Sequence, residues 1–374
     1  MRPDFDPIIV KETFAYLMAE GPDTMEYFYS RLFAAAPDCR SLFPMSMTTQ
    51  RDAMFAALTQ LIWSLDTEAA CGELLGRLGI DHRKFGVTER HYGAFFAALR
   101  DTVRYFIGPD WRPEVADAWQ GALDHICDTM RKAAAADAAV APPWFIAEIV
   151  EHELRSPGVA VLKLAPSEPV PHIAGQYIPV QVTRWPRVWR TFSIANAPRP
   201  GGLITLHVRA VPGGLVSNSL VHHSVPGDAV LLGKPSGDMI LPDNDKHLLC
   251  VAGGTGLAPI KAIIEQVISD AQDGPQRDVT LFVGARQHFD LYDLQDLQLL
   301  ESAYAGLQVI TALSEEPGYS GLVGMLPDLV QEHAEEILPG TEVFVCGPAQ
   351  MVSATTSLLA ATIPPGQIHH DPLS

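Results

Sequence analysis

The residues that could do chemistry fall into three groups along the chain. His82 follows a helical segment, where a neutral imidazole can bind a metal such as iron. Arg190-Thr191-Phe192-Ser193 combines a guanidinium, which can hold phosphates through two hydrogen bonds, with a ring and a hydroxyl. The glycine-rich run Ala252–Pro259 can bring backbone N–H groups close to a diphosphate. The sequence therefore predicts a metal site followed by two sites for phosphate-bearing cofactors.

Length, charge and hydropathy limit what kind of protein this is. A chain of 374 residues implies two or three domains, because single cores rarely grow beyond about 250–300 residues. The net charge of −18 makes nucleic acid and anionic membrane surfaces poor partners. Apolar runs are shorter than the roughly 20 residues needed to span a bilayer. The start, Met1-Arg2-Pro3-Asp4, lacks an apolar signal core, so a cytoplasmic location is expected.

The number and spacing of the five cysteines argue against a disulfide framework and against a cysteine-bound metal site. They are odd in number and widely spaced, which disfavours disulfides, zinc and iron–sulfur sites. We expect most of them to be small buried hydrophobic residues. They are Cys39, Cys71, Cys127, Cys250 and Cys346.

The pattern of apolar residues changes twice along the chain. Up to about residue 133 it is helical in pattern, as in Asp52–Leu65 and His91–Phe106, where apolar residues recur every three or four positions. An alanine-rich stretch, 133–141, then predicts a frayed helix end that leads into a stiff Pro-Pro linker. From Trp144, short strands between proline and glycine turns predict a small antiparallel barrel. These strands are Ile146–Glu151, Val159–Leu164 and Ile204–Val211.

After about Pro242 strands and helices alternate. A buried strand, His247–Ala252, meets the glycine run and is followed by a helix, Ile260–Asp270. A strand at Val279–Gly284 and a helix at Asp290–Ala303 continue the pattern. Such alternation predicts a parallel sheet with helices on both faces.

Two motifs in this last region resemble ferredoxin–NADP reductase-like modules. Gly253, Gly254 and Gly256 lie where a strand ends and a helix begins, with a spacing that differs from the ordinary Rossmann fingerprint. Strand Val343–Val345 leads into Cys-Gly-Pro. The resemblance implies that the glycine turn holds a pyrophosphate and that Cys-Gly-Pro lies beside the nicotinamide. The residues concerned are Gly254, Thr255, Gly256, Leu257, Ala258, Pro259, Cys346, Gly347 and Pro348.

The nucleotide is expected to be NADH, with NADPH possible. Gly284-Ala285-Arg286 and Asp290–Asp293 look like the NADH-using members of that family, and the region has no cluster of basic residues for a 2′-phosphate.

Three further elements resemble the FAD-binding half of the same family, although each alone is also a common surface feature. Arg190 to Ser193 is similar to the Arg-x-Tyr-Ser motif, which implies that Arg190 grips the FAD diphosphate and Ser193 bonds near the reactive nitrogen. Phe192, in place of tyrosine, would pack along the isoalloxazine. Tyr177, in Gly-Gln-Tyr, is expected near the cofactor. The elements supply Tyr177, Arg190, Thr191, Phe192 and Ser193, with Gly214, Val216 and Ser217 at a phosphate-facing turn.

The first 135 or so residues resemble the globin domain of bacterial flavohaemoglobins, and the likeness then continues through both reductase modules. It implies that His82 is the proximal haem ligand, and that Tyr29 and Gln50 are distal hydrogen-bond donors. Phe43 would contact the porphyrin, and Tyr92 would lie beside the proximal histidine. The pattern is that of a divergent, actinobacterial-type member.

Several positions depart from the family. The glutamate that normally hydrogen-bonds the proximal histidine is absent, and its position falls at Ala134. Asp81 replaces the lysine that usually precedes that histidine. Gln50 lies on a stretch that is three residues shorter than the common pattern. The C-terminal segment 368–374 lacks an aromatic residue against the flavin, and Asp371 stands where a glutamate is usual. The sequence therefore leaves open how strongly the proximal histidine donates electron density to the iron. It also leaves open whether the C-terminal segment shields the flavin.

The expected fold is multidomain: an all-α globin domain over 1–136, a linker over 137–143, an antiparallel β-barrel FAD domain over 144–242 and an α/β parallel-sheet NAD domain over 243–374. The resemblance implies a monomeric nitric oxide dioxygenase with haem b, FAD and NAD(P)H, which acts on NO and O2 and releases nitrate. One alternative is an NADH- or organic-acid-driven haem or flavin reductase with another acceptor. A second is a haem-based gas sensor or carrier, which the sequence after 144 disfavours.

Overall fold

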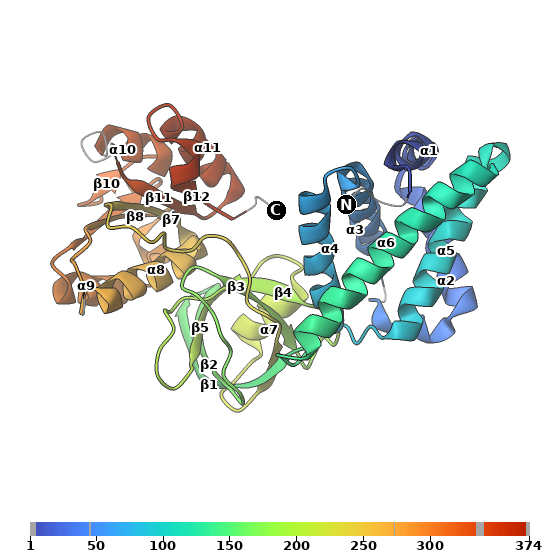
Figure 1. The fold of residues 1–374 in the computed structure, drawn as a ribbon. Helices are drawn as coiled ribbons and strands as arrows, with labels where there is room; N and C mark the ends of the chain where they lie inside the picture. The colour runs from blue at the N-terminus through green and yellow to red at the C-terminus, as the bar shows by residue number, and fades with distance from the viewer. Residues whose placement is uncertain (1–4, 45, 273, 334–339, 372–374) are drawn as a thin grey trace. The chain divides into compact units, whose positions relative to one another are not determined.

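The computed structural model describes residues 5–44, 46–272, 274–333 and 340–371. The chain forms two compact units, residues 1–143 and 144–374 (Figure 1). In the described ranges no helix is both long and apolar enough to span a membrane.

The N-terminal unit is all α-helical, as expected. Amphipathic helices bury one face each, and Phe14, Phe28 and Trp119 are fully buried at its centre. The predicted helices over 52–65 and 91–106 correspond to α3 and α5. The helices are α1 (Pro7–Glu20), α2 (Thr24–Ala35), α3 (Thr48–Ser64), α4 (Glu68–Arg83), α5 (Glu89–Ile107) and α6 (Pro113–Ala138).

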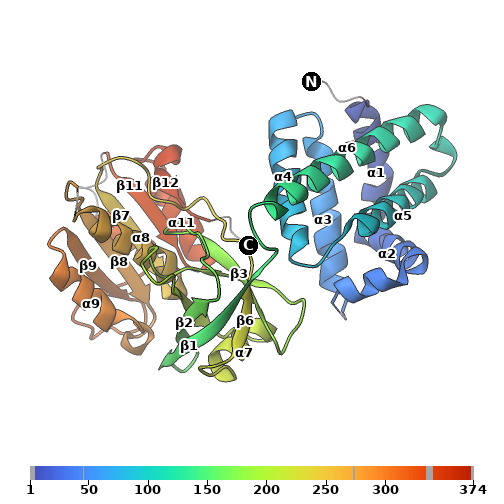
Figure 2. The ribbon, with the colours of Figure 1, turned by 60° about the horizontal axis from the view of Figure 1, so that its bottom comes forward.

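Helices α4 and α6 pack closely, side by side in Figure 1 and Figure 2. Gly79 allows this contact, because a side chain there would overlap the Met130 backbone. Arg83, at the end of α4, forms an ion pair with the buried Asp137 and donates a hydrogen bond to the Ala141 carbonyl over 2.8 Å. The predicted frayed end at 133–141 is therefore wrong for its first half, since α6 is regular to Ala138.

The second unit begins with a six-stranded antiparallel sheet in the order β4-β3-β6-β1-β2-β5. A bridge between Ile194 and Leu206 brings its edge strands together, which closes the sheet around an aliphatic core. A helix, α7 (Leu215–His222), lies in the β5–β6 connection, where the sequence predicted only a turn. The strands are β1 (Phe145–Ser156), β2 (Val159–Pro166), β3 (Tyr177–Val182), β4 (Arg190–Ser193), β5 (Ile204–Arg209) and β6 (Ala229–Leu232).

A six-stranded parallel sheet follows, in the order β10-β9-β8-β7-β11-β12. Alternate side chains of β7 pack against different helices: Cys250 faces the core under α8 and α9, and Val251 faces the core under α10 and α11 (Figure 1). The elements are β7 (Leu248–Gly253), α8 (Leu257–Asp270), β8 (Val279–Ala285), α9 (Leu294–Ala303), β9 (Leu307–Leu313), β10 (Leu322–Val323), α10 (Leu326–His333), β11 (Glu342–Cys346), α11 (Ala349–Leu359) and β12 (Ile368–His369).

The helix that the sequence predicts over 290–303 begins four residues further along the chain in the structure. Asp290 ends a short 3-10 turn, and α9 begins at Leu294. The Asp293 side chain does not cap the helix; Lys261 and Arg155 hold it instead. Tertiary contacts therefore override the local helix signal at this point.

Candidate functional site

Tyr29 and Gln50 lie together inside the N-terminal unit. Tyr29, on α2, is 4% exposed, and Gln50, in the first turn of α3, donates a hydrogen bond from Nε2 to the Tyr29 hydroxyl over 3.3 Å. Burial raises the pKa of Tyr29 to about 12, so the phenol keeps its proton at neutral pH. The shorter stretch before Gln50 thus still brings this amide to the tyrosine.

Aromatic rings surround this pair. The Phe43 ring lies edge-on to Tyr29, with 5.3 Å between centroids, and Phe33 lies 5.5 Å from Phe43. The Phe28 ring lies edge-on to the rings of Tyr29 and Phe95, with 4.9 Å between centroids in each pair. The phenol is therefore held by packing on several sides, and its position is fixed before any ligand arrives.

His82 lies in the last turn of α4. Its Nδ1 is 2.6 Å from the Leu78 carbonyl oxygen, so Nδ1–H donates to that oxygen. Burial lowers the pKa of His82, which favours the neutral imidazole. In this tautomer Nε2 carries a lone pair and is available as a metal ligand.

The surroundings of these residues fit a haem group. Apolar side chains from α3, α4 and α5 and from the α2–α3 and α4–α5 connections pack against the core but stay half-exposed, as expected for the lining of a space that receives a large apolar ligand. They include Phe43, Met54, Leu78, Val87 and Phe95. A neutral histidine with a free Nε2 supplies the fifth iron ligand that such a group needs.

The position of the absent glutamate faces the proximal helix. Met130, Ala134 and Asp137 follow helical spacing on one face of α6. Met130 meets Gly79 and Asp137 meets Arg83, so Ala134 lies between two contacts that bracket His82 on α4. The hydrogen-bond partner of His82 Nδ1 is the neutral Leu78 carbonyl.

Tyr92 is on α5, 7% exposed and stacked parallel to Phe96, with 6.5 Å between ring centroids. The nearby His91, expected to be structural, accepts a hydrogen bond on Nδ1 from the Thr88 backbone over 2.9 Å and so caps α5.

In the barrel, strand register separates the flavin-motif residues onto two faces. Tyr177 of β3 pairs with Ser193 of β4, so their side chains share a face. Phe192 pairs with Ile178 and packs against the barrel core. Of the two aromatic residues in the motifs, Tyr177 is thus the one beside the Ser193 hydroxyl.

Arg190 and the start of α7 supply groups that could hold phosphates. Arg190 and Thr191 are exposed, and one Arg190 nitrogen donates to the Trp189 carbonyl over 2.8 Å, which leaves further N–H groups for a ligand. Gly214 precedes α7, and a Cβ there would meet Val211 at 2.6 Å. Val216 and Ser217 are buried in the first turn. This donor set fits the FAD diphosphate.

The two nucleotide motifs meet at the carboxyl ends of β7 and β11. Ala252 and Cys346 are neighbours in these paired parallel strands. A side chain at Gly256 would overlap the Cys346 carbonyl, and Gly254 has a positive φ of 54° that favours glycine. Thr255 is half-buried, and the first turn of α8 is buried from Leu257 to Pro259. Bare backbone at a helix N-terminus fits a dinucleotide pyrophosphate.

Cys346 and Arg209 complete this edge. Burial raises the pKa of the Cys346 thiol to about 12, so it stays protonated. Arg209, at the end of β5, reaches over the turn: a Cβ on Gly254 would lie 3.3 Å from its Nη2. Arg209 is not among the residues predicted from the sequence, although a basic residue that ends a strand just before the Gly213-Gly214 turn is a usable signal.

The C-terminal segment returns to Tyr177 of β3. Gly237 lies between two groups, since a Cβ there would be 3.1 Å from the Tyr177 ring and 3.6 Å from the Asp371 carboxylate. A carboxylate thus stands close to Tyr177, and burial raises the pKa of Asp371. Residues 372–374 of the expected non-aromatic terminus lie outside the described residues.

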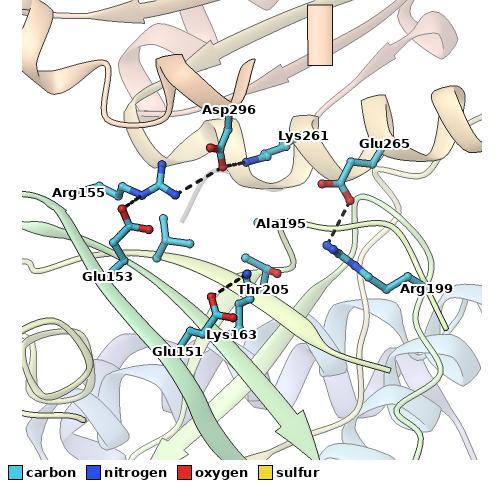
Figure 3. Close-up of a pocket in the computed structure, with 11 residues that line it drawn as sticks. Glu151, Glu153, Arg155, Lys163, Ala195, Arg199, Thr205, Lys261, Glu265 and Asp296 are labelled. Carbon is cyan, nitrogen blue, oxygen red and sulfur yellow. Dashed lines mark hydrogen bonds and ion pairs between the residues drawn. The ribbon is translucent and has the colours of Figure 1, made fainter. Parts of the chain in front are cut away.

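Buried charges join the barrel to the parallel-sheet part of the second unit. Lys261, on α8, donates to Asp293 over 2.6 Å. It also donates to Asp296 over 3.0 Å (Figure 3). Arg155, from β1, reaches the same two carboxylates at 3.3 and 3.6 Å. Beside them Tyr292 lies 2.8 Å from His207 Nδ1 on β5. The segment 292–296 is therefore held from both sides.

A cavity of about 310 Å³ adjoins this network (Figure 3). Its charged lining residues are matched in opposite pairs, which makes it part of the brace between the two sheets. The pairs are Glu151 with Lys163, Glu153 with Arg155, Arg199 with Glu265, and Lys261 with Asp296.

Three family models match the chain: Globin over 26–130, Oxidoreductase FAD-binding domain over 147–240 and Oxidoreductase NAD-binding domain over 250–357. A flavohemoprotein of Deinococcus radiodurans is 27% identical, with 94% of this chain and 91% of that protein covered. The electron transfer component of xylene/toluene monooxygenase from Pseudomonas putida is 36% identical over 54% of this chain, and this chain spans 57% of its length.

Among solved structures, flavohemoglobin from Malassezia yamatoensis with bound FAD and heme covers 98% of both chains with a TM-score of 0.78, at 18% identity. This likeness confirms the fold. Helices, antiparallel barrel and parallel sheet occur in the same order, and the family matches make the chain an NAD(P)H-dependent oxidoreductase with globin, FAD-binding and NAD-binding domains.

Proposed function

We propose that this chain, a flavohaemoglobin homologue that joins a globin domain to FAD- and NAD-binding reductase domains, is a nitric oxide dioxygenase. The observation that carries the proposal is the contact between the buried Tyr29 and Gln50 among apolar side chains. When bound, FAD would supply the means to convert the two electrons of a hydride into single electrons, and haem would supply the iron for the chemistry of O2 and NO. The limits proposed for the reductase domains are those expected from the sequence, 144–242 and 243–374. The helical domain, expected over 1–136, is proposed to extend to Ala141, because Arg83 contacts both Asp137 and Ala141.

The distal residues act as a preset hydrogen-bond donor. Because burial keeps the Tyr29 phenol protonated, its O–H is available to stabilise negative charge that develops on dioxygen. The amide of Gln50 donates to the Tyr29 oxygen and so directs the phenolic hydrogen away from itself. Phe43 would support the porphyrin and His82 would bind the iron, with Tyr92 on the proximal side.

In the reductase half, each motif residue has a binding or orienting task. The backbone amides from Gly254 to Gly256, together with Arg209, would hold the nucleotide diphosphate. The protonated Cys346 thiol would lie beside the nicotinamide without reacting as a thiolate. Ser193 and Tyr177 would contact the isoalloxazine.

The carboxyl end of β9 supports NADH as the nucleotide. Glu315 and Glu316 follow this strand, and Glu316 is fixed by the His288 backbone N–H over 2.8 Å and by His288 Nδ1 over 3.1 Å. The Glu315 amide donates to the Arg286 carbonyl over 2.9 Å. Two carboxylates at the edge where the adenosine half would lie can accept ribose hydroxyls and repel a 2′-phosphate.

The test is NADH-dependent consumption of NO by the haem- and FAD-loaded protein in air, with nitrate assayed as the product. We expect rapid NO loss with stoichiometric nitrate. Replacing Tyr29 by Phe removes one hydrogen bond to a charged oxygen, a loss of about 1.5–3 kcal/mol, so O2 should dissociate roughly 10- to 150-fold faster. NO turnover at the wild-type rate by Tyr29→Phe would refute the distal assignment.

A second candidate is a haem or flavin reductase with an acceptor other than NO. It is favoured by the neutral Leu78 carbonyl as the partner of His82 and by Ala134 on the facing helix, because a neutral partner lends the imidazole less electron density than a carboxylate. Oxidation of NADH with reduction of the flavin but persistence of NO would support this candidate.

A further inference from the structure

The loop that joins β3 to β4 is rigidly built. Within it the Trp185 amide donates to the Val182 carbonyl over 3.1 Å, and the Val188 amide donates to the Trp185 carbonyl over 3.2 Å. Arg187 has a φ of +67°, alone among described non-glycine residues in being positive, and its amide donates to Gln181 Oε1 over 2.5 Å. Strained backbone of this kind persists where function favours it.

Two tryptophans in the loop are placed like parts of a ligand site. The indole of Trp185 donates to Ser219 Oγ of α7 over 3.1 Å, yet the residue is 37% exposed, so a fixed ring leaves part of its surface open. Trp189 is 9% exposed, and its Nε1 is buried without an acceptor among the described residues. A buried N–H without a partner needs an acceptor, which a water molecule or a ligand atom can supply.

The charge around the loop is unusual for this chain. Its net charge is −18, yet no aspartate or glutamate occurs between Glu168 and Asp228, while this stretch holds five arginines. Arg184 and Arg187 are exposed and form no ion pair with described residues. The surface beside Arg190 is thus prepared for an anion.

The order of groups along β4 identifies the ligand. Ser193 marks the isoalloxazine end and Arg190 the diphosphate end, about 10 Å apart along a strand. Continuing in the same direction leads from the diphosphate to the β3–β4 loop, and Trp185 is tied to α7, whose first turn faces the phosphates. FAD continues beyond its diphosphate as adenosine, which carries a flat ring that can stack on an indole.

We propose that the 183–189 loop binds the AMP half of FAD, with the adenine stacked on Trp185 and Arg184 and Arg187 near the phosphates. This inference rests on the flavin placement proposed above. It makes the loop the part of the chain that distinguishes FAD from FMN, because FMN lacks the adenosine.

The experiment compares FAD and FMN on the same variants. The full-length haem-containing protein is freed of flavin and titrated with either cofactor, and Kd is measured by fluorescence or calorimetry. Trp185→Ala should raise the Kd of FAD roughly 5- to 150-fold and leave that of FMN unchanged. Trp185→Phe keeps a stacking ring and should recover most of the affinity. Trp63→Ala, at an exposed tryptophan of the N-terminal unit, is the matched control and should change neither Kd.

Failure of this inference is distinguishable from failure of the flavin placement. Tyr177→Ala should weaken FAD and FMN alike; if it changes neither, the placement itself is wrong. If Trp185→Ala weakens both cofactors equally, the loop only supports α7 and the inference is overturned. Unchanged affinity for both would leave the loop free for a partner protein, and the inference would also be wrong.

Discussion

Replacing Asp293 by Asn should destabilise the second unit strongly, because this carboxylate is completely buried. Its side chain is 0% exposed and accepts from Lys261 and Arg155, whose side chains are 10% and 18% exposed. Asparagine keeps the shape but removes the charge. Breaking a buried pair costs about 3–5 kcal/mol, and Asp296, at 37% exposure, still accompanies Lys261, so we expect about 3 kcal/mol.

The assay is urea unfolding of the loaded protein at pH 7. Flavin fluorescence reports on the second unit, and the haem absorbance band reports on the N-terminal unit as an internal control. With a slope near 3 kcal/mol per M, the flavin-detected midpoint should fall by about 1 M. Glu73→Gln removes the exposed pair with Arg77, 3.3 Å apart, and should cost less than about 0.5 kcal/mol. A loss below about 1 kcal/mol for Asp293→Asn, or an equal shift of the haem-detected transition, would refute the reasoning.

Two other substitutions test single features. Ala134→Glu should give His82 a charged partner, strengthen that hydrogen bond by about 1–2 kcal/mol and lower the haem potential by about 40–85 mV; an unchanged potential in redox titration would exclude this placement. Burial raises the folded pKa of Glu265, so its stabilising contribution is lost as pH rises from the unfolded value through the folded pKa. Glu265→Gln still accepts from the Ala197 amide and should flatten that loss above pH 4, as thermal unfolding across pH 4–8 would show.

The parts of the site that the sequence predicts are those that topology forces together. The glycine turn and the Cys-Gly-Pro segment each follow a buried strand, and parallel strands place their carboxyl ends at one edge, so Gly256 meets Cys346. Helical periodicity likewise predicts the helical fold that carries Tyr29 and His82. The Tyr29–Gln50 contact does not follow from periodicity in this way, because a shortened connection leaves the helix register open.

Other features depend on partners distant in sequence. Asp290 to Asp293 has the composition of a helix start, but Lys261 and Arg155 take the Asp293 carboxylate and the helix begins later. Arg209 becomes a site residue only when β5 closes beside the glycine turn. Local patterns contain no information on such contacts, since burial and tertiary pairing decide them.

The Arg83 contact fixes where the haem-binding part of this chain can be cut. Arg83 is 12% exposed and holds both Asp137 and the Ala141 carbonyl, which lie beyond the globin match that ends at residue 130. A fragment that stops at residue 136 would leave this guanidinium buried without either partner, next to the proposed iron ligand. Isolated globin fragments should therefore extend through Ala141 to retain haem. In shorter fragments the bond between His82 and the iron should weaken first, and haem should then be lost.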